Sequence, residues 1–325
     1  MDRKLISRGN ATFIPGILKS GVLTLLFFAA FLLSTQPVFA DWFPLIERLV
    51  TDGFDEPAIR ELFSRPEVRF EPGAMSSKLD ELIKKTSKKP ADSPPYHSRL
   101  VYKSLLKEGV ITRARSYLRE NSEILENISA EYCVPKEIVV SILLVETRLG
   151  DYVGGKCAFN SLASMSLCRD LETIRPYLPK KLLTKKNEDY AREVCQRKAD
   201  WAYDELRALI LYAAWSGLDP LSLPGSIYGA IGLCQFMPSN VLLYGVDADN
   251  DGRVDLFVKP DALYSIANYL KGHGWRCTMD KPSQARVIFD YNKSYVYVNT
   301  VLAVAEKLKD HSRRKPCTVL VQGKQ

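Results

Sequence analysis

Histidine is the scarcest chemistry-bearing residue in this chain, with only three among 325 residues. No histidine accompanies a cysteine in a recognisable motif, which disfavours a cysteine nucleophile activated by a neighbouring base. The seven cysteines show no Cys-x-x-Cys spacing, and this argues against a structural zinc site. Strand-type alternation is nearly absent, so an all-β fold is excluded. No basic run with interleaved aromatic residues occurs, and no nucleic-acid partner is expected.

Long apolar runs are confined to the amino terminus. Basic residues precede the run Val22 to Leu33, and Val38-Phe39-Ala40 provides a small-residue cleavage site. The run is shorter than the roughly 20 apolar residues that a membrane span needs. We therefore expect residues 1–40 to be a signal peptide, with a retained amino-terminal anchor as the alternative. No cysteine follows the cut, so a lipid anchor is not expected.

The mature chain is expected to be exported to the periplasm and to keep no stable membrane anchor. Removal of residues 1–40 takes away a net charge of +3 and leaves +4 of the original +7. This mild excess suits an anionic matrix. Export also changes the interpretation of the seven cysteines. In an oxidising compartment some of them should pair, and the odd number leaves at least one free. We expect a bridge within the cluster Cys157, Cys168 and Cys195, although the connectivity stays open.

The pattern of apolar residues is helical nearly throughout. Residues 41–111 are expected to form an amino-terminal segment, with two short helices between Trp42 and Arg65 and an irregular, proline-rich stretch over 66–110. A catalytic domain is expected over 112–310, beginning with a helix from Thr112 to Tyr132, and residues 311–325 form a tail.

One carboxylate stands out on the helix predicted from Pro135 to Thr147. Val139, Ile142 and Leu143 precede Glu146 by seven, four and three residues, so all four share one face. Low dielectric around such a group favours the neutral acid and raises its pKa, as a proton donor at neutral pH requires. The plainer alternative is a glutamate at a helix end whose charge reaches water.

A glycine-punctuated loop follows about eighty residues later, with the sequence GAIGLCQFMPSN over Gly229 to Asn240. Its small residues let the backbone come close to a ligand or to another helix. Gln235 offers a donor and an acceptor, which suit a hydroxyl or acetamido group. Pro238 predicts a turn that restarts a helix. A glycine-rich helix contact with a solvated Gln235 is the alternative.

An acidic loop lies between Asp247 and Val258. Carboxylates occupy positions 1, 3, 5 and 9 of a calcium-loop pattern, a glycine occupies position 6, and a backbone carbonyl serves position 7. The predicted ligands are Asp247, Asp249, Asp251, Asp255 and the carbonyl of Arg253. Val258 stands at position 12, where a bidentate acid is expected, so calcium should bind weakly. Asp261 is expected to cap the next helix. An acidic surface turn without metal is the alternative.

A fourth segment, YNKSYVY from Tyr291 to Tyr297, combines aromatic rings with an amide. Rings can stack on sugar faces, and Asn292 can bond an acetamido group. By itself the segment is more typical of helix-start packing with Asn292 as the cap.

Together, VETRLG, GAIGLCQFMPS, the acidic loop and YNKSYVY resemble the lytic murein transglycosylases, most closely the B type, from about Thr112 to Leu308. The resemblance implies a mainly α, lysozyme-like fold with Glu146 as the catalytic acid. It also implies that Ser226, Gln235, Tyr291, Asn292 and Tyr297 contact the substrate. One departure is the short stretch between Trp275 and Asp290, where the B type has an insertion, and this predicts a more open groove.

The activity that the resemblance implies is cleavage of the bond between N-acetylmuramic acid and N-acetylglucosamine in peptidoglycan glycan strands. The muramyl 6-hydroxyl would act as nucleophile and form a 1,6-anhydro end without water. Two alternatives stay open. A hydrolytic muramidase of the same fold would incorporate water, and a non-catalytic protein that binds the wall or calcium would not need Glu146.

Overall fold

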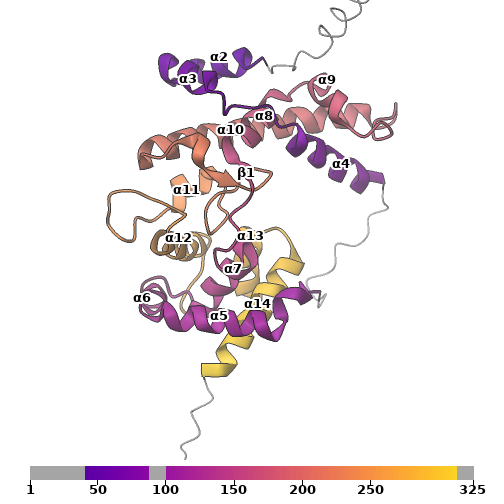
Figure 1. Ribbon diagram of the computed structural model, residues 1–325. Coiled ribbons are helices and arrows are strands. Elements are labelled where there is room, and N and C mark those ends of the chain that lie inside the picture. The colour runs from indigo at the N-terminus through magenta and orange to yellow at the C-terminus, as the bar shows by residue number, and fades with distance from the viewer. Residues whose placement is uncertain (1–40, 88–99, 313–325) are drawn as a thin grey trace, which may run out of the picture. The chain divides into compact units, whose positions relative to one another are not determined.

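The computed structural model describes residues 41–87 and 100–312, and helices dominate these ranges (Figure 1). The expected signal peptide, residues 1–40, and nearly all of the expected tail lie outside the described residues. Within residues 41–87 and 100–312, no helix has the length and hydropathy needed to cross a membrane.

Ahead of α5 (Glu108–Glu120), the described residues form three helices and one helical turn. They are α2 (Phe43–Thr51), α3 (Glu56–Ser64), α4 (Gly73–Ser87) and the 3-10 turn η1 (Lys103–Leu106). The break between α2 and α3 confirms the sequence prediction, and Asp55 caps α3 by accepting the N–H of Ala58 at 3.0 Å.

Helix α4 corrects the prediction that residues 66–110 are irregular. The prolines of that stretch flank residues 73–87, and none lies inside them. Met75, Leu79 and Ile83 recur every four residues and are all buried, so an apolar helical face was present in the sequence. The density of prolines on either side obscured it.

The central part of the chain runs from α5 to α9. Its elements are α5 (Glu108–Glu120), α6 (Ser122–Tyr132), α7 (Lys136–Thr147), β1 (Lys156–Cys157), α8 (Ala158–Leu167), α9 (Leu171–Ile174) and η2 (Arg175–Tyr177). The single helix predicted from Thr112 to Tyr132 is wrong, because it is divided at Asn121. The Asn121 side chain donates to the carbonyl of Tyr117 at 2.8 Å, an alternative to helical bonding that asparagine favours.

The remaining elements complete the fold. They are α10 (Glu188–Ser216), η3 (Pro220–Ser222), β2 (Pro224–Gly225), α11 (Pro238–Tyr244), α12 (Lys259–Gly272), α13 (Lys281–Tyr291) and α14 (Tyr295–Ser312). The two short strands pair antiparallel, with Lys156 opposite Gly225. Helix α11 begins at Pro238, as predicted.

Two sets of helices meet around the Gly229–Asn240 loop. The long helix α10 packs against α8, α4 and α11, whereas α7 packs against α14, α5 and α12. Figure 1 shows α14 beside α5 and α7. Buried side chains from both sets form one continuous apolar core.

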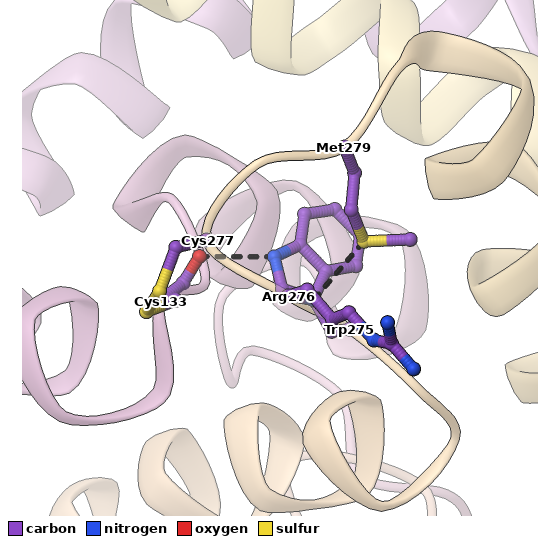
Figure 2. Close-up of a disulfide and its surroundings, with 5 residues drawn as sticks. All are labelled: Cys133, Trp275, Arg276, Cys277 and Met279. Atoms are coloured by element: carbon purple, nitrogen blue, oxygen red, sulfur yellow. Dashed lines mark hydrogen bonds between the residues drawn. A yellow bond between two sulfur atoms is a disulfide. The ribbon is translucent and has the colours of Figure 1, made fainter.

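The disulfide joins Cys133 to Cys277, with 4.6 Å between their Cα atoms (Figure 2). It links the end of α6 to the loop after α12, and the indole of Trp275 donates to the carbonyl of Cys133 at 2.9 Å. The expected bridge within Cys157, Cys168 and Cys195 is therefore wrong. All three are free thiols, as is Cys234. The helical packing brings together two cysteines that are 144 residues apart, a pairing that spacing alone does not reveal.

Candidate active site

Glu146 lies in the last turn of α7, and its side chain is half-buried. The three aliphatic residues that share its face, Val139, Ile142 and Leu143, are fully buried. Burial raises the pKa of Glu146 to about 7, and a hydrogen bond from Tyr297 opposes that rise. The apolar stripe predicted from the sequence thus creates the environment that a neutral carboxylic acid needs.

Tyr297 holds the carboxyl group from the opposite helix. Its hydroxyl donates to Oε1 of Glu146 at 2.6 Å. Burial, followed by the charge of Glu146 and the hydrogen bond to it, raises the pKa of Tyr297 well above its usual range, so the phenol stays protonated. The Tyr297 side chain is only 2% exposed. It is therefore placed to act on the acid, and its ring offers little face for a sugar.

The other residues of the YNKSYVY segment occupy different environments. The ring of Tyr291 stacks on that of Tyr297 with 6.3 Å between centroids, and its hydroxyl donates to the carbonyl of Cys234 at 2.6 Å. Asn292 is exposed and ends α13. The proposal that Asn292 caps a helix start is wrong, because Ser294 precedes α14 and accepts the N–H of Tyr297 at 3.4 Å.

The chain turns sharply after Glu146. Arg148, Leu149 and Gly150 have φ values of 55°, 67° and 98°, a left-handed run that costs residues with side chains about 1–3 kcal/mol each. Arg113 supports the turn by donating to the carbonyl of Arg148 at 2.6 Å. Thr147 bonds the carbonyl of Leu233 at 2.8 Å, which ties the end of α7 to the glycine-rich loop.

Glycine is required at two positions of that loop. A Cβ on Gly229 would lie 2.6 Å from Leu162, and one on Gly232 would lie 2.4 Å from Leu256; both residues also have positive φ. The backbone therefore closely approaches Leu162 of α8 and the turn at Leu256, and a larger residue would displace them. This agrees with the close approach predicted from the sequence.

Gln235 is held in a left-handed conformation with φ of 50°. Its amide nitrogen donates to the carbonyls of Val153 and Gly232, both at 3.0 Å. Both amide protons are therefore used by the main chain, and Oε1 has no hydrogen-bond donor among the described residues. The side chain can thus present an acceptor to a ligand, a narrower capacity than the donor and acceptor predicted.

Ser226 shapes the start of the same loop. Its hydroxyl oxygen accepts the N–H of Tyr228 at 3.3 Å and that of Ala230 at 3.0 Å. The hydroxyl proton is left for another partner. The residue thus has a structural task that the sequence did not suggest, and any contact with substrate would use this proton.

The acidic loop brings three carboxylates together. Oxygens of Asp247, Asp249 and Asp261 lie within 4.8 Å of one another. Burial, followed by the charges of Asp249 and Asp247, raises the pKa of Asp261, and a bound cation would relieve that repulsion. The residues present therefore fit a hard cation that prefers oxygen ligands.

Two of the predicted carboxylate ligands are outside this group. Asp251 accepts the N–H of Arg253 at 2.9 Å, and Asp255 accepts the N–H of Phe257 at 2.8 Å. Asp261 is not a helix cap, because α12 begins at Lys259. Its carboxylate instead accepts the N–H groups of Ala248 and Asp255 at 2.9 and 2.7 Å.

Sequence reasoning overlooked two residues of these sites. Asp261 supplies the carboxylate that Val258 at position 12 cannot. Because Asp261 lies three residues beyond the loop pattern, the pattern did not identify it as a ligand. Tyr102 is 43% exposed, and its backbone N–H bonds Thr300 on α14 at 2.9 Å. No motif marked Tyr102. Burial raises the pKa of the four free thiols in the described part of the chain, which disfavours the alternative of a catalytic cysteine there.

The fold and this carboxyl group define a class of helical, lysozyme-like proteins. The transglycosylase SLT domain family matches residues 39–286, and the chain belongs to this family. The membrane-bound lytic murein transglycosylase B of Escherichia coli is 30% identical over 236 residues, which are 71% of this chain and 56% of that protein. The chain thus spans a little over half the length of this curated relative.

Solved structures share the fold. The soluble lytic transglycosylase SltB1 from Pseudomonas aeruginosa is 24% identical, with a TM-score of 0.59 over 83% of this chain and 99% of that one. The E. coli lytic transglycosylase Slt35 in complex with bulgecin A is 21% identical, with a TM-score of 0.62 over 85% of this chain and 95% of that one.

Proposed function

We propose that this chain is a lytic transglycosylase that cleaves the β-1,4 bond between N-acetylmuramic acid and N-acetylglucosamine in peptidoglycan. The observation that carries the proposal is the half-buried carboxyl group of Glu146 at the end of a buried apolar helix face, where burial raises its pKa to about 7. Family membership supports the substrate class. A P. aeruginosa relative with the same fold, SltB3, was solved in complex with NAG-anhNAM-pentapeptide.

Glu146 acts first as a general acid. It gives its proton to the glycosidic oxygen as the bond from that oxygen to C1 of the muramyl residue breaks. The acetamido carbonyl of the muramyl residue supports the positive charge that develops at C1. The tyrosine hydroxyl of Tyr297, 2.6 Å from Oε1, stabilises the carboxylate that Glu146 has become.

The same group then acts as a base. The carboxylate takes the proton of the muramyl 6-hydroxyl while the oxygen of that hydroxyl bonds to C1. This step closes the 1,6-anhydro ring and restores neutral Glu146. Other glycosidases use two carboxylates, commonly about 5–9.5 Å apart. Among the described residues, no second acid contributes to the pKa shift of Glu146, and the substrate's own hydroxyl makes one unnecessary.

Substrate contacts are assigned to residues predicted from the sequence and, in addition, to Tyr102. Oε1 of Gln235 accepts from a sugar hydroxyl or an acetamido N–H, and the exposed amide of Asn292 bonds an acetamido group. Ser226 offers its hydroxyl proton. Tyr291 shapes the site through Tyr297, and the half-exposed ring of Tyr102 offers a face for stacking.

The remaining assignments concern metal and location. The Asp247 loop, with Asp261, would hold a structural calcium ion, and a structure of the E. coli relative Slt35 was solved in complex with calcium. Residues 1–40 direct export to the periplasm, where the glycan strands lie. The mature chain has no other anchor in this proposal.

The test is the mass of the products released from purified peptidoglycan. The wild-type chain should release 1,6-anhydro products, which are lighter by one water than those of a hydrolytic muramidase. Glu146→Gln should reduce cleavage by at least about 10² because it removes the transferable proton. Glu137→Gln, at the half-buried start of the same helix, serves as the control. Hydrated reducing ends, or near-native cleavage by the Glu146 variant, would contradict the proposal.

A further inference from the structure

The hydroxyl of Thr147 lies at the junction of three backbone segments. Oγ1 donates to the carbonyl of Leu233 at 2.8 Å, lies 3.3 Å from the carbonyl of Leu143, and accepts the N–H of Gly150 at 3.2 Å. The residue is 1% exposed, so water cannot replace these bonds. One hydroxyl thus joins the last turn of α7, the left-handed turn after it and the glycine-rich loop.

The loop segment that receives this bond also supports the partner of Glu146. The carbonyls of Leu233 and Cys234 accept the hydroxyls of Thr147 and Tyr291 at 2.8 and 2.6 Å. Tyr291 stacks on Tyr297, which holds Glu146. Two consecutive peptide groups therefore hold the end of α7 directly and the end of α13 through Tyr291, whose ring lies against Tyr297 of α14.

The segment that contains Leu233 and Cys234 is also held by the turn at Leu256. The N–H of Leu233 donates to the carbonyl of Leu256 at 2.8 Å, and Gly232 allows that approach. Gln235 follows two residues later and bonds Val153. A displacement of Leu233 relative to Thr147 would change the separation of Glu146 from Gln235.

We infer that Thr147 is a positioning residue for the general acid: its hydroxyl sets Glu146 in register with the loop that carries Gln235. This inference rests on the proposed function and assigns Thr147 no contact with substrate. A displacement of about 1 Å can cost on the order of 10²-fold in rate. Loss of the Thr147 hydroxyl should therefore slow the chemical step.

The chain offers a well-matched set of variants. Thr147→Val keeps the shape and removes the hydroxyl, whereas Thr147→Ser keeps the hydroxyl. Ser141→Ala removes another fully buried hydroxyl of α7, one that bonds the carbonyl of Glu137 within the helix. We expect kcat to fall about 10- to 100-fold in Thr147→Val with KM within about twofold. Thr147→Ser and Ser141→Ala should stay within about threefold.

A second readout is independent of turnover. NMR titration of carbon-13-labelled glutamate carboxyl groups, with Glu146→Gln to assign the signal, should show a raised pKa for Glu146 in Thr147→Val, because the bond from Tyr297 weakens. The pKa should be unchanged in Thr147→Ser and Ser141→Ala. A wild-type titration and wild-type kcat per folded molecule in Thr147→Val would overturn the inference. If neither the wild-type chain nor any variant forms anhydro products, the proposed function fails. The titration of Glu146 still decides whether Thr147 positions this carboxyl group.

Discussion

At the scale of single residues, the chemistry depends on two opposing effects on one carboxyl group. Burial among aliphatic side chains raises the pKa of Glu146, and the Tyr297 hydrogen bond lowers it. Their balance leaves the acid near neutrality, where a group can both donate and accept a proton. The pair therefore serves both halves of the proposed reaction better than either an exposed or an unpartnered glutamate would.

The first prediction at this scale concerns Tyr297→Phe. Loss of the hydroxyl removes the influence that lowers the pKa, so the pKa of Glu146 should rise above about 7. Because the proton donor must be protonated, the alkaline limb of the kcat/KM profile should move to higher pH. The carboxylate loses its stabilising donor as well, so kcat should fall about 10-fold or more.

Tyr264→Phe is the matched control, because its ring lies on α12 against Tyr132. Its pH profile should follow that of the wild-type chain. An alkaline limb that stays in place in Tyr297→Phe would show that the phenol does not set the acidity of Glu146.

At the scale of elements, the ends of helices carry the site. Helix α7 presents Glu146 in its final turn, and α14 presents Tyr297 in its first. The disulfide joins the end of α6 to the loop that leads through α13 to α14. It therefore restrains the path between the two helices that hold the carboxyl group.

Loss of this bridge gives the prediction at the element scale. Cys133→Ser with Cys277→Ser frees a loop of 144 residues, so the free energy of unfolding should fall by about 2–4 kcal/mol. Chemical denaturation in the absence of reductant measures the change. Cys157→Ser removes a thiol that is already free and should leave the transition midpoint nearly unmoved. Equal midpoints for the double variant and the wild-type chain would mean that the bridge adds no stability.

At the scale of the whole molecule, one core includes residues from α2 through α14. Unfolding should therefore be cooperative, and a ligand bound at any folded site should stabilise the entire unit by mass action. The acidic loop offers such a site, because Asp247, Asp249 and Asp261 gather within 4.8 Å.

The prediction at this scale is that 10 mM calcium raises the melting temperature. With Val258 at position 12, the dissociation constant should be weak, about 10⁻⁴ M or poorer. Magnesium should do less because it demands tighter octahedral geometry. Asp249→Asn with Asp251→Asn should abolish the response and keep most of the activity at low temperature. Glu193→Gln with Glu123→Gln is a control of equal charge. A melting temperature indifferent to calcium would identify the loop as an acidic turn.

Much of the site could be predicted because its determinants are local. The stripe before Glu146 is a matter of helical spacing, and the need for Gly229 and Gly232 follows from backbone freedom. The errors in predicting the helices also had local causes. Asn121 divided a helix that periodicity made continuous, and prolines around residues 73–87 concealed α4.

The sequence by itself determined the helical class, the apolar face that carries the acid, and the loops rich in glycine and aspartate. These follow from spacing and backbone preference, which act between neighbours along the chain. Only the tertiary structure decided which distant groups meet. The Tyr297 hydroxyl reaches Glu146 across 151 residues and Cys277 reaches Cys133 across 144, while Asp261 joins the acidic loop from the next helix. Such contacts depend on how whole helices pack, and no local pattern specifies that packing.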